Sequence, residues 1–299
     1  MTDPKKSNHC SPARYEHGQT YGTCLNKMEL LKVAKTANIK VSPQTPKKAL
    51  TKTIKKTLAP KCGDKETCWL KNITPTERQQ ILSKAFRPEK PADWIKNPRK
   101  WLNTYDILRV MSQYEARYKT FKFLGVYPID FTVKDDSGVC IGDSLCDFHI
   151  NTLLAQKKKK FGLILNLDKH TQGGSHWVAM FCNLNPKSKR NFGIYYYDSV
   201  AHPPDLFNKE KYVTNFMNSI VQQVQQTFPT ATASKFKSHH NTIQRQFKNT
   251  ECGNFSQVFI TQMLKDIPFL EICQRMPKDD KIQEARDIFY RPPNSVVTN

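Results

Sequence analysis

The spacing of apolar residues predicts helices along most of the chain. Leu50, Ile54 and Leu58 recur every four residues, which places them on one face of a helix. Thr74-Pro-Thr-Glu77 combines a threonine cap, a proline at the first helical position and a glutamate at the third, a typical helix start. The helices expected on these grounds span residues 28–35, 47–58, 74–86, 103–118 and 209–227, and residues 279–289 are expected to close the fold.

Shorter apolar runs predict strands in the second half of the chain. Each run is almost entirely aliphatic or aromatic, as in strands that are buried on both faces. The expected strands span residues 161–166, 177–182 and 192–197. The polar stretch 185–191 is expected to form the exposed turn between the last two. Strands mixed with helices predict an α+β fold from about residue 94 onward.

Basic charge is concentrated near the N-terminus. The chain has 299 residues, with 47 Lys and Arg against 26 Asp and Glu, for a formal net charge of +21. The first ninety residues hold 19 of the basic and 7 of the acidic residues, which is more than half of the excess. This predicts a basic helical arm over residues 1–92 and a separate core over 93–299. Such an excess indicates a polyanionic partner such as nucleic acid, with an acidic protein as the alternative.

Two further features bear on nucleic-acid binding. The helices on either side of Ile39 resemble the paired helices of SAP-type DNA-binding domains, and a basic arm without that role is the alternative. The lysine run 157–160 is either a solvated face or a second contact for nucleic acid.

The sequence predicts neither export, nor a membrane span, nor a bound metal or cofactor. The N-terminus lacks the apolar core of a signal peptide, and the longest uncharged run, 212–234, is rich in Asn, Gln and Thr. The nine scattered cysteines are therefore expected to be reduced thiols in an intracellular protein. The cysteine pairs closest to a zinc pattern have gaps of five residues, too long for zinc knuckles. The zinc candidates are Cys62 with Cys68, Cys140 with Cys146, and Cys10 with His9 and His17.

Four core residues carry the groups that a cysteine protease needs. Cys252 stands where a loop becomes an apolar, helix-like segment, and a helix N-terminus stabilises a thiolate. His176 at the start of one strand is the expected base, and Asp198 at the end of the next is expected to orient its ring. The backbone N–H of Cys252 and the side-chain amide of Gln246 are the expected oxyanion donors. Papain-like proteases place Gln and Cys first, so the chain order here differs from theirs.

These residues form a pattern that resembles the SUMO-deconjugating, or ubiquitin-like-protein-specific, cysteine protease family. The pattern consists of His176-Trp177, Asp198-Ser199, Gln246 and, after five residues, Cys252-Gly253. Upstream, the stretch from Trp101 to Ile107 resembles a helix start of that family. Within the family, the sequence resembles in particular the polyprotein-processing protease of African swine fever virus, a likeness that extends to Asn166.

The resemblance implies a papain-like α+β core in permuted order and cleavage after Gly-Gly. Two tryptophans of the family close over the substrate glycines, and Trp101 and Trp177 match them, with plain core residues as the alternative. Asn166 is carried over as a substrate-binding residue. The implied function is a viral endopeptidase that processes structural polyproteins during virion maturation, in the virion and the host cytoplasm. The alternatives are a SUMO-deconjugating isopeptidase and an inactive nucleic-acid-binding virion component.

Overall fold

The computed structural model describes residues 9–15 and 22–293. The chain up to Ile95 groups with the segment from Asp287 onward as an N-terminal unit, and Lys96–Arg286 form a central unit. The sequence predicts one boundary between residues 92 and 93, whereas the structure also groups the segment from Asp287 with the N-terminal unit. The predicted boundary therefore stays a prediction. No helix among the described residues is long and apolar enough to cross a membrane.

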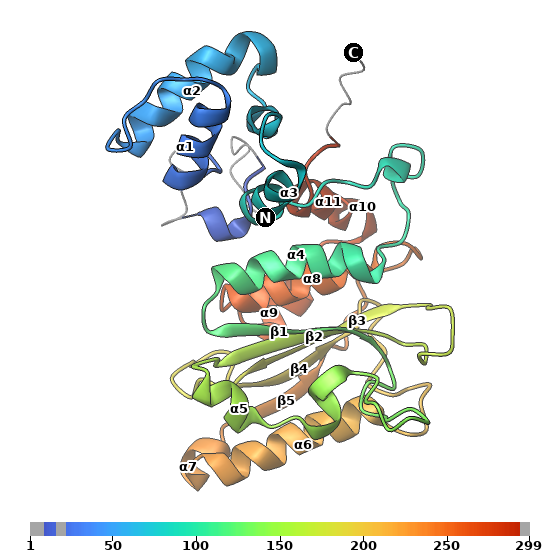
Figure 1. Cartoon of the computed structure of the whole chain (residues 1–299). Coiled ribbons are helices and arrows are strands. Elements are labelled where there is room, and N and C mark those ends of the chain that lie inside the picture. Colours follow the sequence, from blue (N-terminus) through green and yellow to red (C-terminus); the bar gives the residue numbers. More distant parts are fainter. Residues whose placement is uncertain (1–8, 16–21, 294–299) are drawn as a thin grey trace. The chain divides into compact units, whose positions relative to one another are not determined.

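A five-stranded mixed sheet organises the central unit (Figure 1). In spatial order its strands are β1 (Phe121–Pro128), β2 (Lys160–Asn166), β3 (Trp177–Asn183), β4 (Gly193–Tyr197) and β5 (Lys237–His240). β1 pairs with β2 and β4 with β5 in parallel, whereas β2–β3 and β3–β4 are antiparallel. The three predicted strands are confirmed to within one residue. The sequence does not predict β5, because its residues are polar and exposed at the edge of the sheet.

Helices cover both faces of this sheet (Figure 1). On one face lie α4 (Thr104–Arg117) and α8 (Cys252–Leu264), and on the other α5 (Ile150–Ala155) and α6 (Tyr212–Thr227). The apolar stripe of α6 is buried in the core, as its spacing predicts. Nearly every residue of α8 is buried, and Ile260 of this helix packs over Gly162 of β2.

Short helices complete the chain. They are α7 (Thr230–Ala233), α9 (Phe269–Arg275), α10 (Asp279–Ile282), α11 (Ala285–Phe289) and the 3-10 turn Asp143–Asp147. Residues 279–289, which were expected to close the fold, form the separate helices α10 and α11, with a turn at Gln283 and Glu284 between them. The start of α4 is as predicted: Asn103 and Asp106 cap each other's backbone N–H groups.

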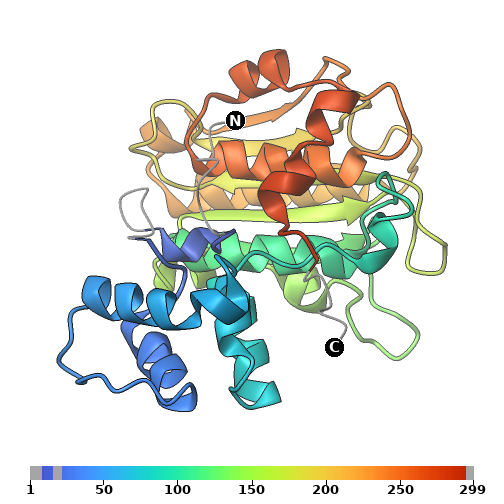
Figure 2. The same cartoon turned by 90° about the horizontal axis from the view of Figure 1, so that it is seen from above.

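Three helices build the N-terminal unit (blue to cyan in Figure 2). They are α1 (Lys27–Thr36), α2 (Lys47–Cys62) and α3 (Pro75–Ala85), with 3-10 turns at Pro12–Arg14, Glu66–Leu70 and Ala92–Trp94. All three were expected, α2 from its apolar spacing and α3 from its start at Thr74–Glu77, although α2 extends through Pro60. Leu30, Val33, Leu50 and Ile54 are fully buried, so that α1 and α2 share a small core.

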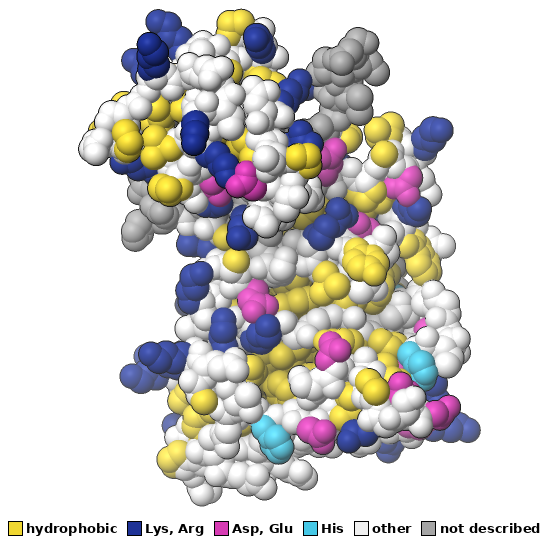
Figure 3. All heavy atoms as spheres, in the orientation of Figure 1, with side chains coloured by type: hydrophobic (Ala, Val, Ile, Leu, Met, Phe, Trp, Pro, Cys, Tyr) yellow, Lys and Arg dark blue, Asp and Glu magenta, His cyan; other side chains and the backbone are white. Residues whose placement is uncertain are grey.

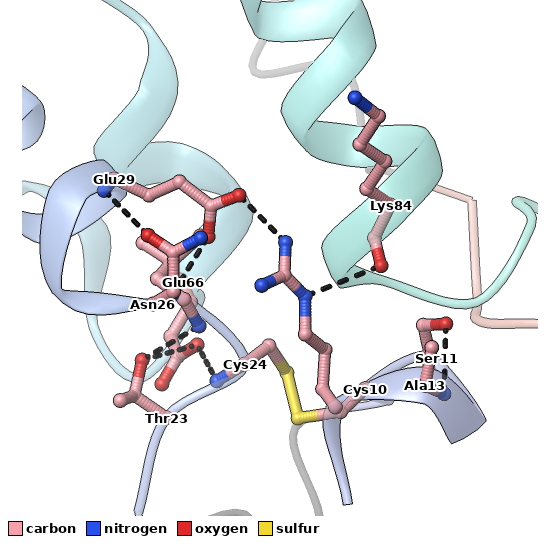
Figure 4. Close-up of a disulfide and its surroundings, with 11 residues drawn as sticks. Cys10, Ser11, Ala13, Thr23, Cys24, Asn26, Glu29, Glu66 and Lys84 are labelled. Atoms are coloured by element: carbon pink, nitrogen blue, oxygen red, sulfur yellow. Dashed lines mark hydrogen bonds and ion pairs between the residues drawn. A yellow bond between two sulfur atoms is a disulfide. The ribbon is translucent and has the colours of Figure 1, made fainter. Parts of the chain in front are cut away.

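Six of the nine cysteines form disulfides, so the expectation of reduced thiols is wrong for them. The pairs are Cys10–Cys24, Cys62–Cys68 and Cys140–Cys146, and the free cysteines are Cys182, Cys252 and Cys273. Beside the first pair, Glu66 accepts hydrogen bonds from Thr23 and from the backbone of Cys24 (Figure 4). Because the apolar core of the N-terminal unit is small, cross-links that restrict the unfolded chain add to its stability.

Alkylation of the unfolded protein tests these pairings. Without a reductant we expect three carbamidomethyl groups by intact-mass spectrometry, because only Cys182, Cys252 and Cys273 are free thiols. After full reduction the same protein should carry nine. Nine groups without reductant would contradict the disulfides and restore the reduced state that the sequence suggests.

Candidate active site

The antiparallel pairing of β3 and β4 brings His176 and Asp198 together. Ala179 of β3 pairs with Tyr197 of β4, so the residue before one strand and the residue after the other lie at the same end of the sheet. The distance from His176 Nε2 to Asp198 Oδ1 is 2.7 Å. Asp198 is fully buried, whereas the His176 side chain keeps 17% of its exposure. The two residues expected to act together are therefore in contact.

Cys252 is the first residue of α8, as the sequence predicts. Its sulfur therefore lies at the positive end of the helix dipole, which favours a thiolate. Gly253 lets this end of the helix approach Leu102, because a Cβ on the glycine would meet the Leu102 side chain at 3.0 Å. One turn later, Ser256 donates a hydrogen bond to the carbonyl of Trp177, which ties α8 to β3.

Two partners determine the charge of His176. Burial alone would lower its pKa, but hydrogen bonds to Asp198 and Cys252 outweigh burial and raise the pKa of His176 to about 10. Because Nε2 faces Asp198, Nδ1 is the ring nitrogen available to the thiol. The raised pKa favours an imidazolium at neutral pH, held between the Asp198 carboxylate and the sulfur of Cys252.

The other two free cysteines lie in surroundings that suppress ionisation. Burial raises the pKa of Cys182, in the middle of β3, well above its ordinary value. Burial also raises the pKa of Cys273 to about 12, with Arg245 opposing it. Among residues 9–15 and 22–293 no three side chains are grouped as metal ligands, and His17 of the zinc candidates lies outside these ranges. Cys252 is thus the free thiol in a setting that favours reaction.

Asn241 holds Asp198 in place, a role that the sequence did not suggest. Its Oδ1 accepts a hydrogen bond from the Asp198 N–H at 2.8 Å, and its Nδ2 donates to the Asp198 carbonyl at 2.6 Å. The Val200 N–H donates to Asp198 Oδ1 at 2.9 Å. A lone asparagine after a short polar strand gives no sequence signal, because its role depends on a partner 43 residues away.

Gln246 is anchored on both sides of its amide. Its Oε1 accepts a hydrogen bond from Ser199 Oγ at 2.6 Å, and its Nε2 donates to the Lys248 carbonyl at 2.6 Å. The backbone N–H of Gln246 also donates to the Ser199 carbonyl. Ser199 follows Asp198 directly, so the predicted oxyanion donor is tied to the predicted acid.

Two open hollows meet at Trp101. The first, here called the tryptophan hollow, has a volume of about 610 Å³, and its lining includes Trp101, Leu102, Asn166 and Trp177. The second, here called the phenylalanine hollow, measures about 870 Å³, and its lining includes Trp101, His176, Phe207, Gln246 and Phe247. Trp177 is buried and donates its Nε1–H to the Leu102 carbonyl at 2.9 Å, whereas Trp101 is 40% exposed. Both predicted tryptophans therefore line the tryptophan hollow.

Asn166 shapes the loop that borders the tryptophan hollow. Its Oδ1 accepts hydrogen bonds from the N–H groups of Asp168 and Ser175, at 3.0 and 3.1 Å. Gly174 in this loop has a φ of +90°, and a Cβ there would lie 3.1 Å from Asn166 Nδ2. Asn166 thus braces the wall, and its predicted contact with substrate stays a prediction.

A buried charge pair connects the loop before Cys252 to the loop before Trp101. Glu251 is fully buried and accepts hydrogen bonds from Thr250 and Asn254. Arg286, which is 4% exposed, places Nε 3.5 Å from Glu251 and donates from Nη2 to the Lys100 carbonyl at 2.6 Å. Sequence reasoning missed Arg286 because it lies in a short C-terminal helix without a recognisable motif.

The pKa of His176 gives a direct test of this geometry. We expect its ring protons to titrate by NMR near pH 10, and in Asp198→Ala at a distinctly lower pH, because the main partner that raises this pKa is gone. Asp130→Ala is the matched control, since Asp130 pairs with His170 at 2.6 Å instead. An unchanged His176 titration in Asp198→Ala would contradict the assigned contact.

Known proteins share both the sequence and the fold. Residues 151–290 match the Ulp1 protease family, C-terminal catalytic domain. A thiol protease of Acanthamoeba polyphaga mimivirus is 28% identical across 95% of this chain and 93% of its own length. A SUMO-1 cysteine protease of African swine fever virus is 25% identical over 138 residues, 44% of either chain.

The crystal structure of the African swine fever virus pS273R protease superposes with a TM-score of 0.64 and 17% identity, over 96% of this chain and 97% of that one. These matches show that the chain is a cysteine-type peptidase, with a segment similar to the catalytic domain of the Ulp1 family and to proteases that these viruses encode.

Proposed function

We propose that Cys252, His176 and Asp198 form the catalytic triad and that Gln246 stabilises the oxyanion. The observation that carries this is the 2.7 Å contact between His176 and Asp198 beside a thiol at the start of α8. The first N–H groups of a helix have no intrahelical partner, so the N–H of Cys252 can receive the oxyanion. Gln246 Nε2 carries a second hydrogen besides the one donated to Lys248.

The reaction then proceeds through an acyl-enzyme. The Cys252 thiolate attacks the substrate carbonyl carbon, and the His176 imidazolium gives its proton to the leaving amine as the C–N bond breaks. Neutral His176 next takes a proton from water, which attacks the thioester and releases the acid. The returning thiolate restores the ion pair with His176. Asp198 keeps the ring orientation through both halves of the cycle.

The proposed substrate is a viral structural polyprotein that is cut after Gly-Gly during virion maturation. Trp177 is fixed by its bond to Leu102, and Trp101 lies exposed on the same hollow, so a chain passing between them meets two indole rings. Glycine has no Cβ, which makes it the residue best suited to such a passage. We place this activity in the assembling virion and the host cytoplasm.

A SUMO-deconjugating isopeptidase would use the same chemistry on a different substrate. The name of the swine fever virus relative, a SUMO-1 cysteine protease, favours keeping this second candidate. A vinyl sulfone probe built on a ubiquitin-like C-terminus separates the two. Rapid adduct formation at Cys252 supports the deconjugase, and slow labelling with efficient cleavage of Gly-Gly peptides supports the polyprotein protease.

Cleavage of Gly-Gly peptides tests the proposed function. We expect Cys252→Ala to lower kcat by about a thousandfold or more, because the nucleophile is removed. Cys273→Ala is the matched control, since Cys273 is a free, buried thiol outside the triad. Both variants are checked for folding by thermal unfolding.

Wild-type protein that leaves every Gly-Gly peptide intact, with the three disulfides verified, would favour the third candidate, an inactive nucleic-acid-binding virion component. Cleavage that survives in Cys252→Ala would remove the triad assignment instead.

We also propose that the basic N-terminal unit contacts a polyanion such as nucleic acid. Lysines cover the outer surface of α2, whose inner positions Leu50, Thr51 and Ile54 are buried. The exposed lysines of this helix are Lys48, Lys52, Lys55, Lys56 and Lys61. The helix itself contains no acidic residue to neutralise these lysines. Lys55 pairs with Asp64, which follows the helix, at 2.8 Å. Figure 3 shows Lys and Arg side chains over this part of the surface.

A salt titration of DNA binding tests this contact. We expect the affinity to fall about tenfold or more between roughly 50 and 200 mM salt, because each phosphate contact releases counterions. Replacing Lys48 and Lys52 by Ala should weaken binding and flatten the slope. Replacing Lys187 and Lys189 in the β3–β4 turn is the charge-matched control. Equal DNA affinities of the two double variants would contradict the proposal that α2 contacts nucleic acid.

A further inference from the structure

The phenylalanine hollow exposes aromatic side chains beside His176. Phe207 is 76% exposed and Phe247 is 62% exposed, and both line the hollow together with Trp101 and His176. Single exposed apolar residues are common, but three aromatic rings around one opening mark a binding surface. The proposed role of His176 indicates which part of the substrate this surface contacts.

His176 separates the two sides of the reacting bond. In the proposed mechanism it protonates the leaving amine, so the chain that follows the cleaved bond lies on the His176 side. His176 lines the phenylalanine hollow, whereas Trp177 and Asn166 line the tryptophan hollow. The residues before the bond therefore occupy the tryptophan hollow, and those after it enter the phenylalanine hollow.

Neighbouring residues hold the backbone of Phe247 and the ring of Phe207, although both rings are exposed. The Phe247 N–H donates to both carboxylate oxygens of the buried Asp279, and the Lys278 ammonium lies 5.2 Å from the Phe247 ring centre. Phe207 packs edge-on against His202, with 5.1 Å between ring centres. A surface of this kind binds a partner without first ordering its own backbone.

The charges around the hollow disfavour a cationic residue. Arg99 and Lys248 both pair with the exposed carboxylate of Asp280, at 2.6 and 2.7 Å. Asp168 is the one acidic side chain among the described lining residues. Its Oδ1 accepts from Ser175 Oγ and its Oδ2 from the Gly174 N–H, so that each oxygen already holds one hydrogen bond within the protein.

We propose that the phenylalanine hollow is a specificity site for the first residues after the cleaved bond and that it selects a large apolar or aromatic side chain there. This inference rests on the proposed function and adds to it a preference on the leaving side. A peptide that continues beyond Gly-Gly with Phe or Leu fills the space between Phe207 and Phe247. One that continues with Lys meets Arg99 and Lys248 instead.

Peptides that differ in one residue test the preference. They share the sequence up to Gly-Gly and continue with Phe, Leu, Ala, Asp or Lys, and kcat/KM is measured for each. We expect Phe and Leu to exceed Ala by about tenfold or more, as burial of a large apolar side chain permits. In Phe207→Ala and Phe247→Ala this ratio should fall towards one. Leu270→Ala, an equally exposed apolar residue on α9, is the control and should keep the wild-type ratio.

Binding of the released fragments separates this inference from the proposed function. Amine-side fragments beginning with Phe or Ala are titrated into Cys252→Ala, where no cleavage is needed. Tighter binding of the Phe fragment, lost in the Phe207→Ala background, upholds the hollow even if no Gly-Gly peptide is cut. Efficient Gly-Gly cleavage with equal kcat/KM for Phe and Ala peptides, or ratios unchanged in both phenylalanine variants, overturns the inference and leaves the protease function standing.

Discussion

The position of β3 is the constraint on which the rest of the active site depends. It is buried along its whole length between β2 and β4, with α8 packed against it. A slip of one residue would turn every core side chain of the strand to the opposite face, so its register is strongly fixed. His176 precedes this strand, Asp198 follows its neighbour, and Cys252 begins the helix on top. The position of this one strand thus fixes how three side chains that are distant in sequence lie relative to one another.

Much of this arrangement could be predicted from the sequence because the candidate catalytic residues lie at the ends of strands and helices. His176 directly precedes a strand, Asp198 directly follows one and Cys252 begins a helix, and each boundary has a local signature in apolar periodicity. The amphipathic pattern of α6 was equally clear. Such local signals survive without knowledge of the tertiary fold.

The features that escaped prediction depend on contacts between distant segments. Asn241 and Arg286 act through partners on other elements, and neither residue type has a pattern of its own. The strand β5 is polar and exposed, so the pairing with β4 rather than composition makes it a strand. The disulfides were missed because the lack of an export signal predicted reduced thiols, and the spacing of cysteines does not show which sulfurs face one another.

Leu102 joins two parts of the site that would otherwise be separate. Its carbonyl receives the Trp177 indole, and its side chain fills the space that Gly253 leaves beside Cys252. A change in this leucine would alter the tryptophan hollow and the position of Cys252 in a single step. In the proposed binding mode, a new cleavage preference can evolve more easily at the exposed Phe207 and Phe247, which can be exchanged without moving Leu102.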